Sequence, residues 1–225
     1  MRIRWYGQSA FLVEGSKRVA IDPFGSMEGM ASRGFTFDYP PIGPIEADVL
    51  LITHEHRDHS GAEVVQGSPP TFRSTAGTFD TPIGELVAIA SEHDEVAGTQ
   101  RGPNTIFCFE LDGLRLCHFG DFGQASLRPE QRDAIGSVDV LFLPVGGGPT
   151  IGADGATAVV RTLAPRLVVA MHFGNAAVNF VEPPDAFLDA VGGDVRRLET
   201  SEFDVDDVIG AAGSTVTVVP AAPLD

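Results

Sequence analysis

The sequence lacks the features that mark membrane and secreted proteins. It has no run of twenty apolar residues, and it does not open with a charged and then apolar signal segment. We therefore expect a cytoplasmic protein with no membrane partner, whose folded part begins at residue 1. A chain of 225 residues can bury a large core, so we expect a single domain over residues 1–225.

Basic residues are also scarce, and Lys17 is the only lysine. The chain has 15 basic and 31 acidic residues, which gives a net charge of −16. A field of that sign repels phosphodiester backbones, so nucleic acid is disfavoured as the main substrate unless bound metals and a local arginine patch reverse it. We expect a small molecule as the partner, and the composition leaves a homo-oligomer open.

Cysteine is limited to Cys108 and Cys117. They flank Asp112-Gly113, a dipeptide that favours a type I′ hairpin turn and would place the two cysteines directly opposite each other. A disulfide across such a pair is strained, and the cytosol is reducing, so we predict two reduced core cysteines. One pair in a chain of this size provides no disulfide framework.

Short strand-like runs outnumber helical ones. Helices are predicted at residues 62–66, 129–135, 155–163 and 184–191, from caps, a first-turn proline and terminal glycines. Strands come first as hairpins and later alternate with helices. This order predicts an α/β fold of two mixed sheets packed face to face, with outer helices. Strands are predicted at residues 2–6, 10–14, 18–21, 48–53, 85–90, 105–111, 114–119, 138–143, 167–171 and 215–219.

Two further features concern organisation. The runs at residues 19–23 and 47–52 resemble those at 116–121 and 138–143, which suggests two similar halves, roughly 1–110 and 111–225. Residues 24–44 form a long segment rich in glycine, proline and aromatic residues. Loops of that length are usually functional or disordered. We interpret this one as a possible lid, with simple packing against the core as the alternative.

Three of the six histidines lie within six residues, in the segment His54-Glu55-His56-Arg57-Asp58-His59. A strand that ends at Thr53 can deliver His54 and His56 to the same side, because side chains two apart on an extended chain point the same way. A following turn can bring Asp58 and His59 to a second point. Four such donors exceed what one tetrahedral ion with an open position takes from a single loop, so two metals are the natural interpretation.

Three more residues of metal-ligand type stand where predicted strands stop. They are His93, Asp121 and His172. Each alone is more often a core or turn residue than a ligand. Together with the histidine loop, they complete two metal sites that share one pocket.

The series from His54 to His172 resembles the metallo-β-lactamase superfamily, whose members bind one or two ions between two αββα halves. The resemblance spans nearly the whole chain and implies a four-layer αββα sandwich. It further implies that His54, His56 and His93 hold one ion, that Asp58, His59 and His172 hold the other, and that Asp121 bridges both. Short motifs resemble the branch of metal-dependent hydrolases akin to ascorbate-6-phosphate lactonase: residues 5–11 (WYGQSAF), 21–24 (IDPF), 101–107 (RGPNTIF), 143–147 (LPVGG) and 171–174 (MHFG).

The sequence departs from this pattern at two positions. Relatives often have histidine where this chain has Gln8 and Gln124. Neither position is an expected metal ligand, so the site survives, but the substrate inferred from those relatives becomes doubtful. We treat Gln8 as a candidate substrate-binding residue.

Other residues receive supporting roles. Asp22 could orient a ligand histidine from outside the metal shell, although an aspartate in an Asp-Pro turn explains it equally well. His118 is interpreted as a core residue or as a support of the ligands. Arg101 and Asn175 are candidate substrate contacts.

These residues predict a hydrolase with two divalent ions, zinc first, with manganese or iron as alternatives. A water bridging two ions about 3.5 to 4 Å apart has its pKa lowered towards about 7, which leaves hydroxide aimed at an electrophile. Asp58 is the candidate catalytic residue, because a ligand at the open face can orient that hydroxide and take its proton. We expect an ester-like bond in a small molecule, in a lactone or a phosphoester, to be cleaved. A phosphodiesterase or nuclease, or a mono-iron oxygenase, is the alternative.

Overall fold

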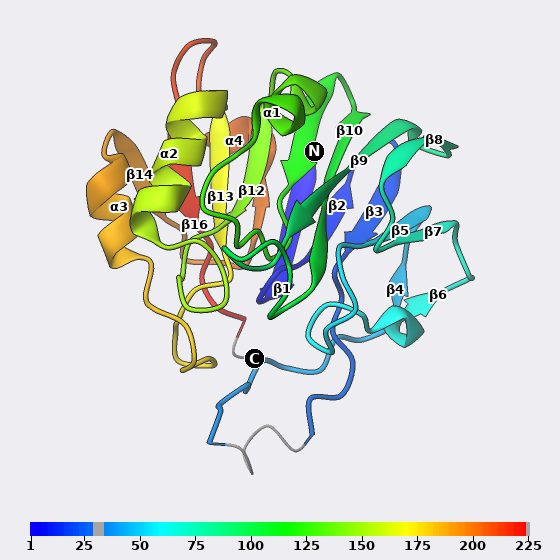
Figure 1. The fold of residues 1–225 in the computed structure, drawn as a ribbon. Coiled ribbons are helices and arrows are strands. Elements are labelled where there is room, and N and C mark those ends of the chain that lie inside the picture. The colour runs from blue at the N-terminus through cyan, green and yellow to red at the C-terminus, as the bar shows by residue number, and fades with distance from the viewer. Residues whose placement is uncertain (29–33, 224–225) are drawn as a thin grey trace.

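The computed structural model describes residues 1–28 and 34–223, and it places two large sheets face to face (Figure 1). The first sheet has six strands in the order β15-β1-β2-β3-β5-β7. Strands β1 to β3 pair antiparallel, whereas β5 joins β3 in parallel. The bounds are β1 (Arg2–Gly7), β2 (Ala10–Glu14), β3 (Arg18–Ile21), β5 (Val49–Ile52), β7 (Thr71–Arg73) and β15 (Glu202–Asp204). A separate parallel pair joins β4 (Ile45–Glu46) and β6 (Val65–Gln66).

The second sheet has eight strands in the order β14-β16-β13-β12-β11-β10-β9-β8. Its first part is an antiparallel meander, and from β11 onward the strands pair in parallel. Both predicted sheets are therefore mixed, as expected. The bounds are β8 (Gly77–Thr81), β9 (Gly84–Glu92), β10 (Pro103–Leu111), β11 (Leu114–His118), β12 (Val140–Pro144), β13 (Leu167–Met171), β14 (Asp194–Arg197) and β16 (Val216–Val219).

Helices α1, α2 and α3 lie against the outer side of the second sheet (Figure 1). α2 (Ala153–Leu163) buries one face through Ala156, Val160 and Leu163, the spacing expected of a helix with one apolar stripe. α1 (Pro129–Ile135) has the predicted bounds, and α3 (Asp185–Val191) begins one residue late, after Pro184. The short α4 (Val205–Val208) follows β15.

The main core lies between the two sheets. Phe11 of β2 packs edge-on against Phe142 of β12, with ring centroids 4.8 Å apart. Trp5, Phe107 and Phe109 are also completely buried. Burying one such side chain contributes about 1.5–3 kcal/mol. The sheets are therefore held in fixed register, and their strand ends form a rigid frame.

The outer face of the first sheet is covered differently. Among the described residues, Leu12 and Ile52 on this face pack against Phe24, Tyr39 and Val178, which come from loops rather than α-helices. The segment predicted as a lid thus packs on the core through its buried Phe24 and Tyr39, which is the alternative interpretation. Residues 29–33 of that segment lie outside the described part of the chain, and its role as a lid stays a prediction.

The hairpin prediction is confirmed in detail. Cys108 pairs with Cys117 across β10 and β11, and Asp112 and Gly113 have φ values of 52° and 77°, both positive as a type I′ turn requires. Both cysteines are free thiols and are buried.

The predicted helix at residues 62–66 is wrong. The chain instead makes a 3₁₀ turn at Ala62–Val64 and then enters β6. Gly61 provides no side-chain cap for a helix, and Val65 has φ −94° and ψ 122°, the extended conformation that β-branched residues favour. The apolar pattern over five residues was too short to distinguish the two.

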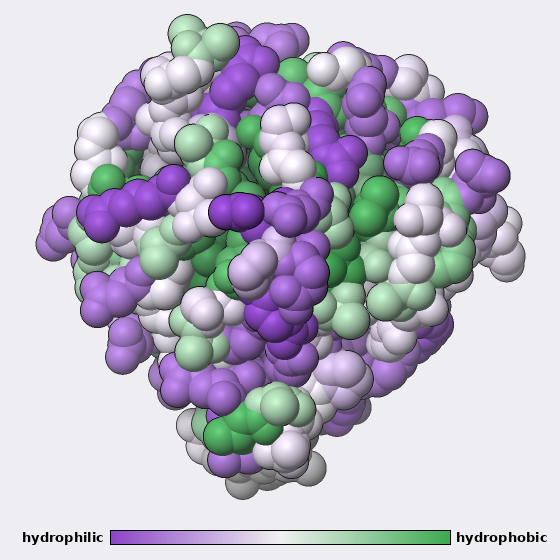
Figure 2. All heavy atoms as spheres, turned by 45° about the horizontal axis from the view of Figure 1, so that its top comes forward, coloured by the Kyte–Doolittle hydropathy of each residue, from purple (hydrophilic) through white to green (hydrophobic). Residues whose placement is uncertain are grey.

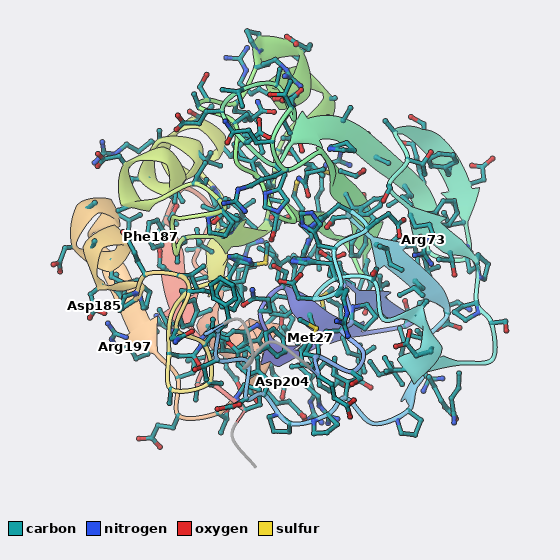
Figure 3. The ribbon with its side chains drawn as sticks, turned by 60° about the horizontal axis from the view of Figure 1, so that its bottom comes forward. Met27, Arg73, Asp185, Phe187, Arg197 and Asp204 are labelled. Carbon is teal, nitrogen blue, oxygen red and sulfur yellow. The ribbon has the colours of Figure 1, made fainter. Side chains whose placement is uncertain are left out.

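The surface is polar. Figure 2 shows hydrophilic side chains projecting outermost on one face, with hydrophobic residues set deeper between them. At the edge strand β14, Arg197 donates to Asp185 of α3 at 2.8 Å, and Figure 3 shows the two side by side. None of the described helices is long and apolar enough to cross a membrane.

Candidate metal centre

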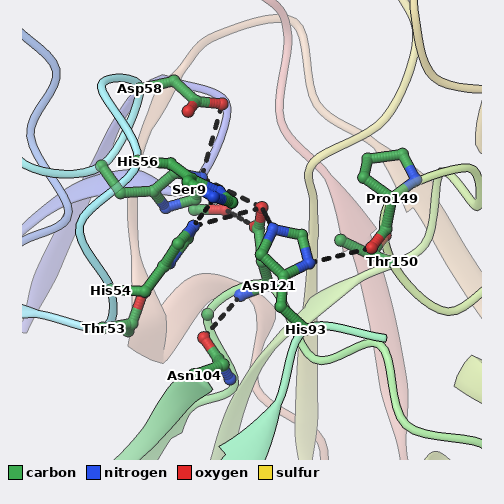
Figure 4. A network of polar contacts seen from close by, with 12 residues as sticks. Ser9, Thr53, His54, His56, Asp58, His93, Asn104, Asp121, Pro149 and Thr150 are labelled. Carbon is green, nitrogen blue, oxygen red and sulfur yellow. Dashed lines mark hydrogen bonds and ion pairs between the residues drawn. The ribbon is translucent and has the colours of Figure 1, made fainter. Parts of the chain in front are cut away.

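The seven candidate ligands meet at one end of the sandwich, where strands of both sheets stop. Figure 4 labels His54, His56, Asp58, His93 and Asp121 among them. The loop after β5 carries His54 to His59, whereas the other three follow β9, β11 and β13 of the second sheet. Three sets of three have their donor atoms within 4.8 Å of one another, and one of them joins Asp22 to His54 and His59. The other two are His54, His56 and His93, and Asp58, His59 and His172. These are the two sets that the sequence resemblance implies.

Asp121 lies between the two sets. Its Oδ2 atom is 3.0 Å from Nε2 of His93 and 3.7 Å from Nε2 of His54, both in the first set. The same oxygen is 3.2 Å from Nε2 of His59 and 3.3 Å from Nε2 of His172, in the second set. One carboxylate oxygen therefore faces four imidazole nitrogens, which is the position of a bridging ligand.

Asp121 is held in place by Asn104 of β10, a residue that the sequence analysis did not single out. The Asp121 backbone N–H donates to Asn104 Oδ1 at 3.0 Å. Asn104 in turn donates to the carbonyl oxygen of Phe119 and to Oγ of Ser91, at 2.8 Å each. A buried asparagine inside a strand is a weak signal of such a role, because its partners depend on which loop lies opposite.

Asp22 orients His59, as the sequence suggested. The Nδ1–H of His59 donates to Asp22 Oδ2 at 2.9 Å, and both side chains are completely buried. This bond leaves Nε2 of His59 directed at Asp121 and Asp58. Carboxylates outside the metal shell commonly fix ligand histidines in this way.

His93 is oriented by a backbone carbonyl. Its Nδ1–H donates to the oxygen of Pro149 at 3.0 Å, so Nε2 carries the lone pair that faces Asp121. His118 instead supports the loops. Gly120 N–H donates to its Nδ1 at 3.1 Å, so its Nε2–H donates to the carbonyl oxygen of Ser9, also at 3.1 Å. His118 thus joins the turn after β1 to the loop that carries Asp121.

Three residues of the centre have a left-handed backbone. Gln8, Asp22 and His172 have φ values of 52°, 46° and 51°. Each left-handed residue other than glycine costs about 1–2 kcal/mol. Such strain persists only where the surrounding structure holds it, and it is concentrated at functional sites.

Burial and neighbouring charges shift the pKa values of His59 and Asp121 in opposite directions. Burial acts to lower the pKa of His59, but Asp121 and Asp58 outweigh it and raise that pKa well above its usual range. Burial likewise acts to raise the pKa of Asp121, but His172 and His59 hold it well below the usual range. Burial lowers the pKa of His54, whose imidazole is therefore neutral. The charge of ionised Asp121 is thus balanced by the protonated His59, and a divalent cation bound between the two would replace that proton.

Unpartnered polar atoms provide a test of whether a metal fits. Among the described residues, four buried side-chain polar atoms lack a hydrogen-bond partner, and three of them belong to residues of this centre: Gln8 Oε1, His59 Nε2 and His172 Nδ1. Of these, His59 Nε2 is the atom that faces the carboxylates of Asp58 and Asp121. Unpartnered buried polar groups are rare, and a bound ion is one of the partners that such a group can take. Imidazole with carboxylate suits zinc, manganese and iron. The cluster is therefore able to bind metal.

Comparison with known proteins agrees with this geometry. Residues 2–172 match the family model described as the beta-lactamase superfamily domain. The chain belongs to the β-lactamase superfamily. The predicted sandwich fold is thereby confirmed, and so is the predicted membership of the metallo-β-lactamase superfamily.

Several curated members of the superfamily are similar over most of their length. A metal-dependent hydrolase of Thermococcus kodakarensis is 30% identical over 223 residues, covering 85% of this chain and 92% of the relative. A metal-dependent hydrolase of Pyrococcus furiosus is 29% identical, with the same coverage of 85% and 92%. This chain is accordingly a metal-dependent hydrolase. The lactonase-like branch stays a prediction.

Solved structures of other proteins show the same fold. A crystal structure from Thermotoga maritima, described as a candidate Zn-dependent hydrolase, has a TM-score of 0.76 at 26% identity and covers 98% of this chain and 99% of its own. CmlA, a diiron β-hydroxylase from Streptomyces venezuelae, has a TM-score of 0.59 at 17% identity, covering 99% of this chain and 53% of CmlA. The second likeness concerns the fold alone.

The three candidate substrate residues differ in whether their side chains reach the metal centre. Gln8 is completely buried, and its side chain contacts Asp58 and His172. Arg101 is exposed, and its backbone N–H is bound by Asp94. Asn175 donates to the hydroxyl of Tyr39 at 2.7 Å. Only Gln8 reaches the metal centre through a hydrogen bond of its side chain.

Gln124, the second departure from the family pattern, lies in another network. It exchanges hydrogen bonds with Gln131 of α1, at 2.8 and 3.0 Å, and donates to the carbonyl oxygen of Ser126. The hydrogen bonds of the Gln124 amide are thus made to residues outside the metal centre.

Proposed function

We propose that this hydrolase cleaves an ester-like bond of a small molecule, in a lactone or a phosphoester, with two divalent ions. Zinc is the first choice, and manganese or iron are alternatives. The observation that carries the proposal is Asp121 Oδ2, which lies within 3.0–3.7 Å of four histidine nitrogens from both ligand sets. All seven residues would act as ligands, with Asp121 shared.

Two ions bound here would acidify a water molecule between them and polarise the carbonyl or phosphoryl oxygen of the substrate. The carboxylate ligands would position that water, and Asp58 and Asp121 differ in how far they are exposed. The side chain of Asp58 is 19% exposed, whereas that of Asp121 is 3% exposed. Asp58 is therefore the carboxylate at the open side, beside the exposed His56.

The charge of Asp58 defines its role. Burial acts to raise its pKa, but His59 outweighs this and keeps the pKa below its usual value. The carboxylate is ionised at neutral pH and would accept a hydrogen bond from a water molecule held by the ions. A carboxylate with so low a pKa is a weak base, so it would orient the water and accept its proton only transiently.

The net charge of −16 supports a small molecule over nucleic acid. An iron oxygenase is the second candidate, because the diiron hydroxylase CmlA shares the fold. Elemental analysis of protein purified without added metal separates the two classes. About two equivalents of zinc or manganese support the hydrolase, whereas iron with oxygen-dependent turnover contradicts it.

A substrate panel tests the proposal directly. It contains lactones, phosphodiesters, phosphonates, thioesters and β-lactams, each assayed with zinc and with manganese. We expect turnover of a lactone or a phosphoester, lost in Asp58→Asn and kept in Asp80→Asn, a matched change at an exposed strand position. Turnover of β-lactams or thioesters alone would overturn the assignment to a lactone or a phosphoester.

A further inference from the structure

The side-chain amide of Gln8 lies inside the second ligand set. Its Nε2 is 3.2 Å from Oδ2 of Asp58 and 3.0 Å from Nε2 of His172. The side chain comes from the turn between β1 and β2 in the first sheet. The ligand assignment that the sequence resemblance implies does not include it.

The spacing of the amide matches that of the ligand atoms themselves. Oδ2 of Asp58 and Nε2 of His59 are 3.5 Å apart, and Oδ2 of Asp121 lies 3.2 and 3.3 Å from His59 and His172. Metal–ligand bonds of about 2.0–2.2 Å separate neighbouring ligand atoms by about 3.0–3.5 Å. The end of the Gln8 side chain is therefore spaced from Asp58 and His172 as a further ligand of the same ion would be.

The backbone holds the amide there. Gln8 has φ 52°, and its carbonyl oxygen accepts hydrogen bonds from Nε1 of Trp5 at 2.9 Å and from the N–H of His172 at 3.1 Å. Trp5 is completely buried. The turn is thus fixed to the core and to the strand end that carries His172.

No hydrogen bond from a described residue fixes the amide oxygen of Gln8 in its present position. Gln8 Oε1 is buried and has no hydrogen-bond partner. A half-turn of the amide exchanges oxygen and nitrogen: it gives up the contacts of the nitrogen with Asp58 and His172, which a bound cation would replace, and breaks no bond of the oxygen. An amide nitrogen carries two hydrogens and does not bind a cation, whereas an amide oxygen is a good ligand for hard divalent ions.

We propose that the amide oxygen of Gln8 is a ligand of the ion held by Asp58, His59 and His172. The inference rests on the proposed two-ion function. With Gln8 and the shared Asp121, this ion has three oxygen and two nitrogen donors. The other ion has the nitrogens of His54, His56 and His93, and one oxygen of Asp121.

This asymmetry gives the two positions different preferences. Oxygen donors suit manganese and other hard ions, whereas imidazole suits zinc. Gln8 therefore directs manganese or ferrous iron to the second position, and zinc remains favoured in the first.

Manganese titration of the purified, metal-free protein tests the inference without substrate. Free Mn²⁺ is followed by electron paramagnetic resonance in the wild type, Gln8→Met, Gln8→Glu and Gln124→Met. Methionine has the length of glutamine without its oxygen. Gln124 is the matched control, since its buried amide bonds away from the ligands.

We expect two bound equivalents in the wild type and in Gln124→Met. Gln8→Met should weaken one equivalent about tenfold or more, and Gln8→Glu should keep or strengthen it, because it retains an oxygen ligand. If Gln8→Met fails to fold, Gln8→Glu alone decides, and a tenfold loss there overturns the inference. Equal binding in Gln8→Met and the wild type overturns it too, as does a wild type that takes up one ion only.

Failure of the proposed function gives a different result. A wild type that binds two ions in this Gln8-dependent way but cleaves no lactone or phosphoester would overturn the substrate assignment and support Gln8 as a ligand.

Discussion

Thr53 and Asp22 are joined by two hydrogen bonds that tie the two ligand sets together. The Thr53 hydroxyl donates to Asp22 Oδ2 at 2.6 Å, and its N–H donates to Oδ1 at 2.7 Å. The same hydroxyl accepts a hydrogen bond from Nδ1 of His54 at 3.0 Å, while Asp22 Oδ2 also accepts from Nδ1 of His59. A single carboxylate thus orients His59 directly and His54 through a hydroxyl.

Replacing Thr53 by Val should lower metal affinity about 10- to 100-fold, the range seen when such orienting groups are removed. Thr53→Ser retains the hydroxyl and should stay close to the wild type. Isothermal titration with zinc measures both. Thr162→Val is the control, because its hydroxyl bonds only within α2. Equal affinity in the valine and serine variants would show that the hydroxyl orients nothing.

His56 and Asp121 should differ in the number of ions they control. His56 belongs to one set, so His56→Ala should lose about one equivalent and most activity. Asp121 faces both sets, so Asp121→Ala should lose both ions and all activity. Mass spectrometry of metal content, with circular dichroism to verify folding, measures this. Full stoichiometry in either variant contradicts the ligand assignment.

Chelation should destabilise the protein reversibly. An ion present at about 100 times its dissociation constant stabilises the native state by about 2.7 kcal/mol. For a chain of this size, each kcal/mol shifts Tm by about 2–4 °C. We expect EDTA to lower Tm by about 5–10 °C and zinc or manganese to restore it, as followed by scanning calorimetry. An unchanged Tm would show that no tightly held ion contributes.

We expect the Asp94 carboxylate to make the stability of the protein depend on pH. Its carboxylate accepts backbone N–H groups from Val96, Gly98 and Arg101 in the loop after His93. Burial acts to raise its pKa, but these bonds outweigh it and keep the pKa below the ordinary value of 3.8. The stabilisation is therefore complete above that value and is lost as the pH falls through the lower, folded value.

Asp94→Asn should accordingly lower the free energy of unfolding at pH 7, and its difference from the wild type should shrink at pH 3. Urea unfolding of both proteins with chelator present measures this. A difference that is the same at both pH values would assign the effect to geometry rather than to charge.

Much of the fold could be predicted from apolar patterning. The runs at β2, β3 and β13 have the predicted bounds, because buried apolar residues are bounded there by turn residues or charges. The patterning does not predict strands β4, β6, β7, β8, β14 and β15. They are short, and nearly all of their residues are at least partly exposed, as in Asp194–Arg197, so hydrogen bonding to a neighbouring strand defines them rather than their own side chains.

The candidate ligands could be predicted for a similar reason. Their chemistry is unusual enough to be seen in isolation, and all of them stand at strand ends. Thr53 and Asn104 could not, because a hydroxyl or an amide acquires its role only from the loop that lies opposite it. Arg101 illustrates the reverse case, since its place in a family-like motif says nothing of where its side chain points.

The ligands from His54 to His172 span more than half of the chain and are supplied by both sheets. An ion shared among them would act as a cross-link between the two sheets. It would close chain loops far longer than the hairpin between Cys108 and Cys117, the longest loop that a disulfide in this chain could close. Separating the sheets would therefore require releasing the metal first, so the rate of global unfolding would be set by metal dissociation.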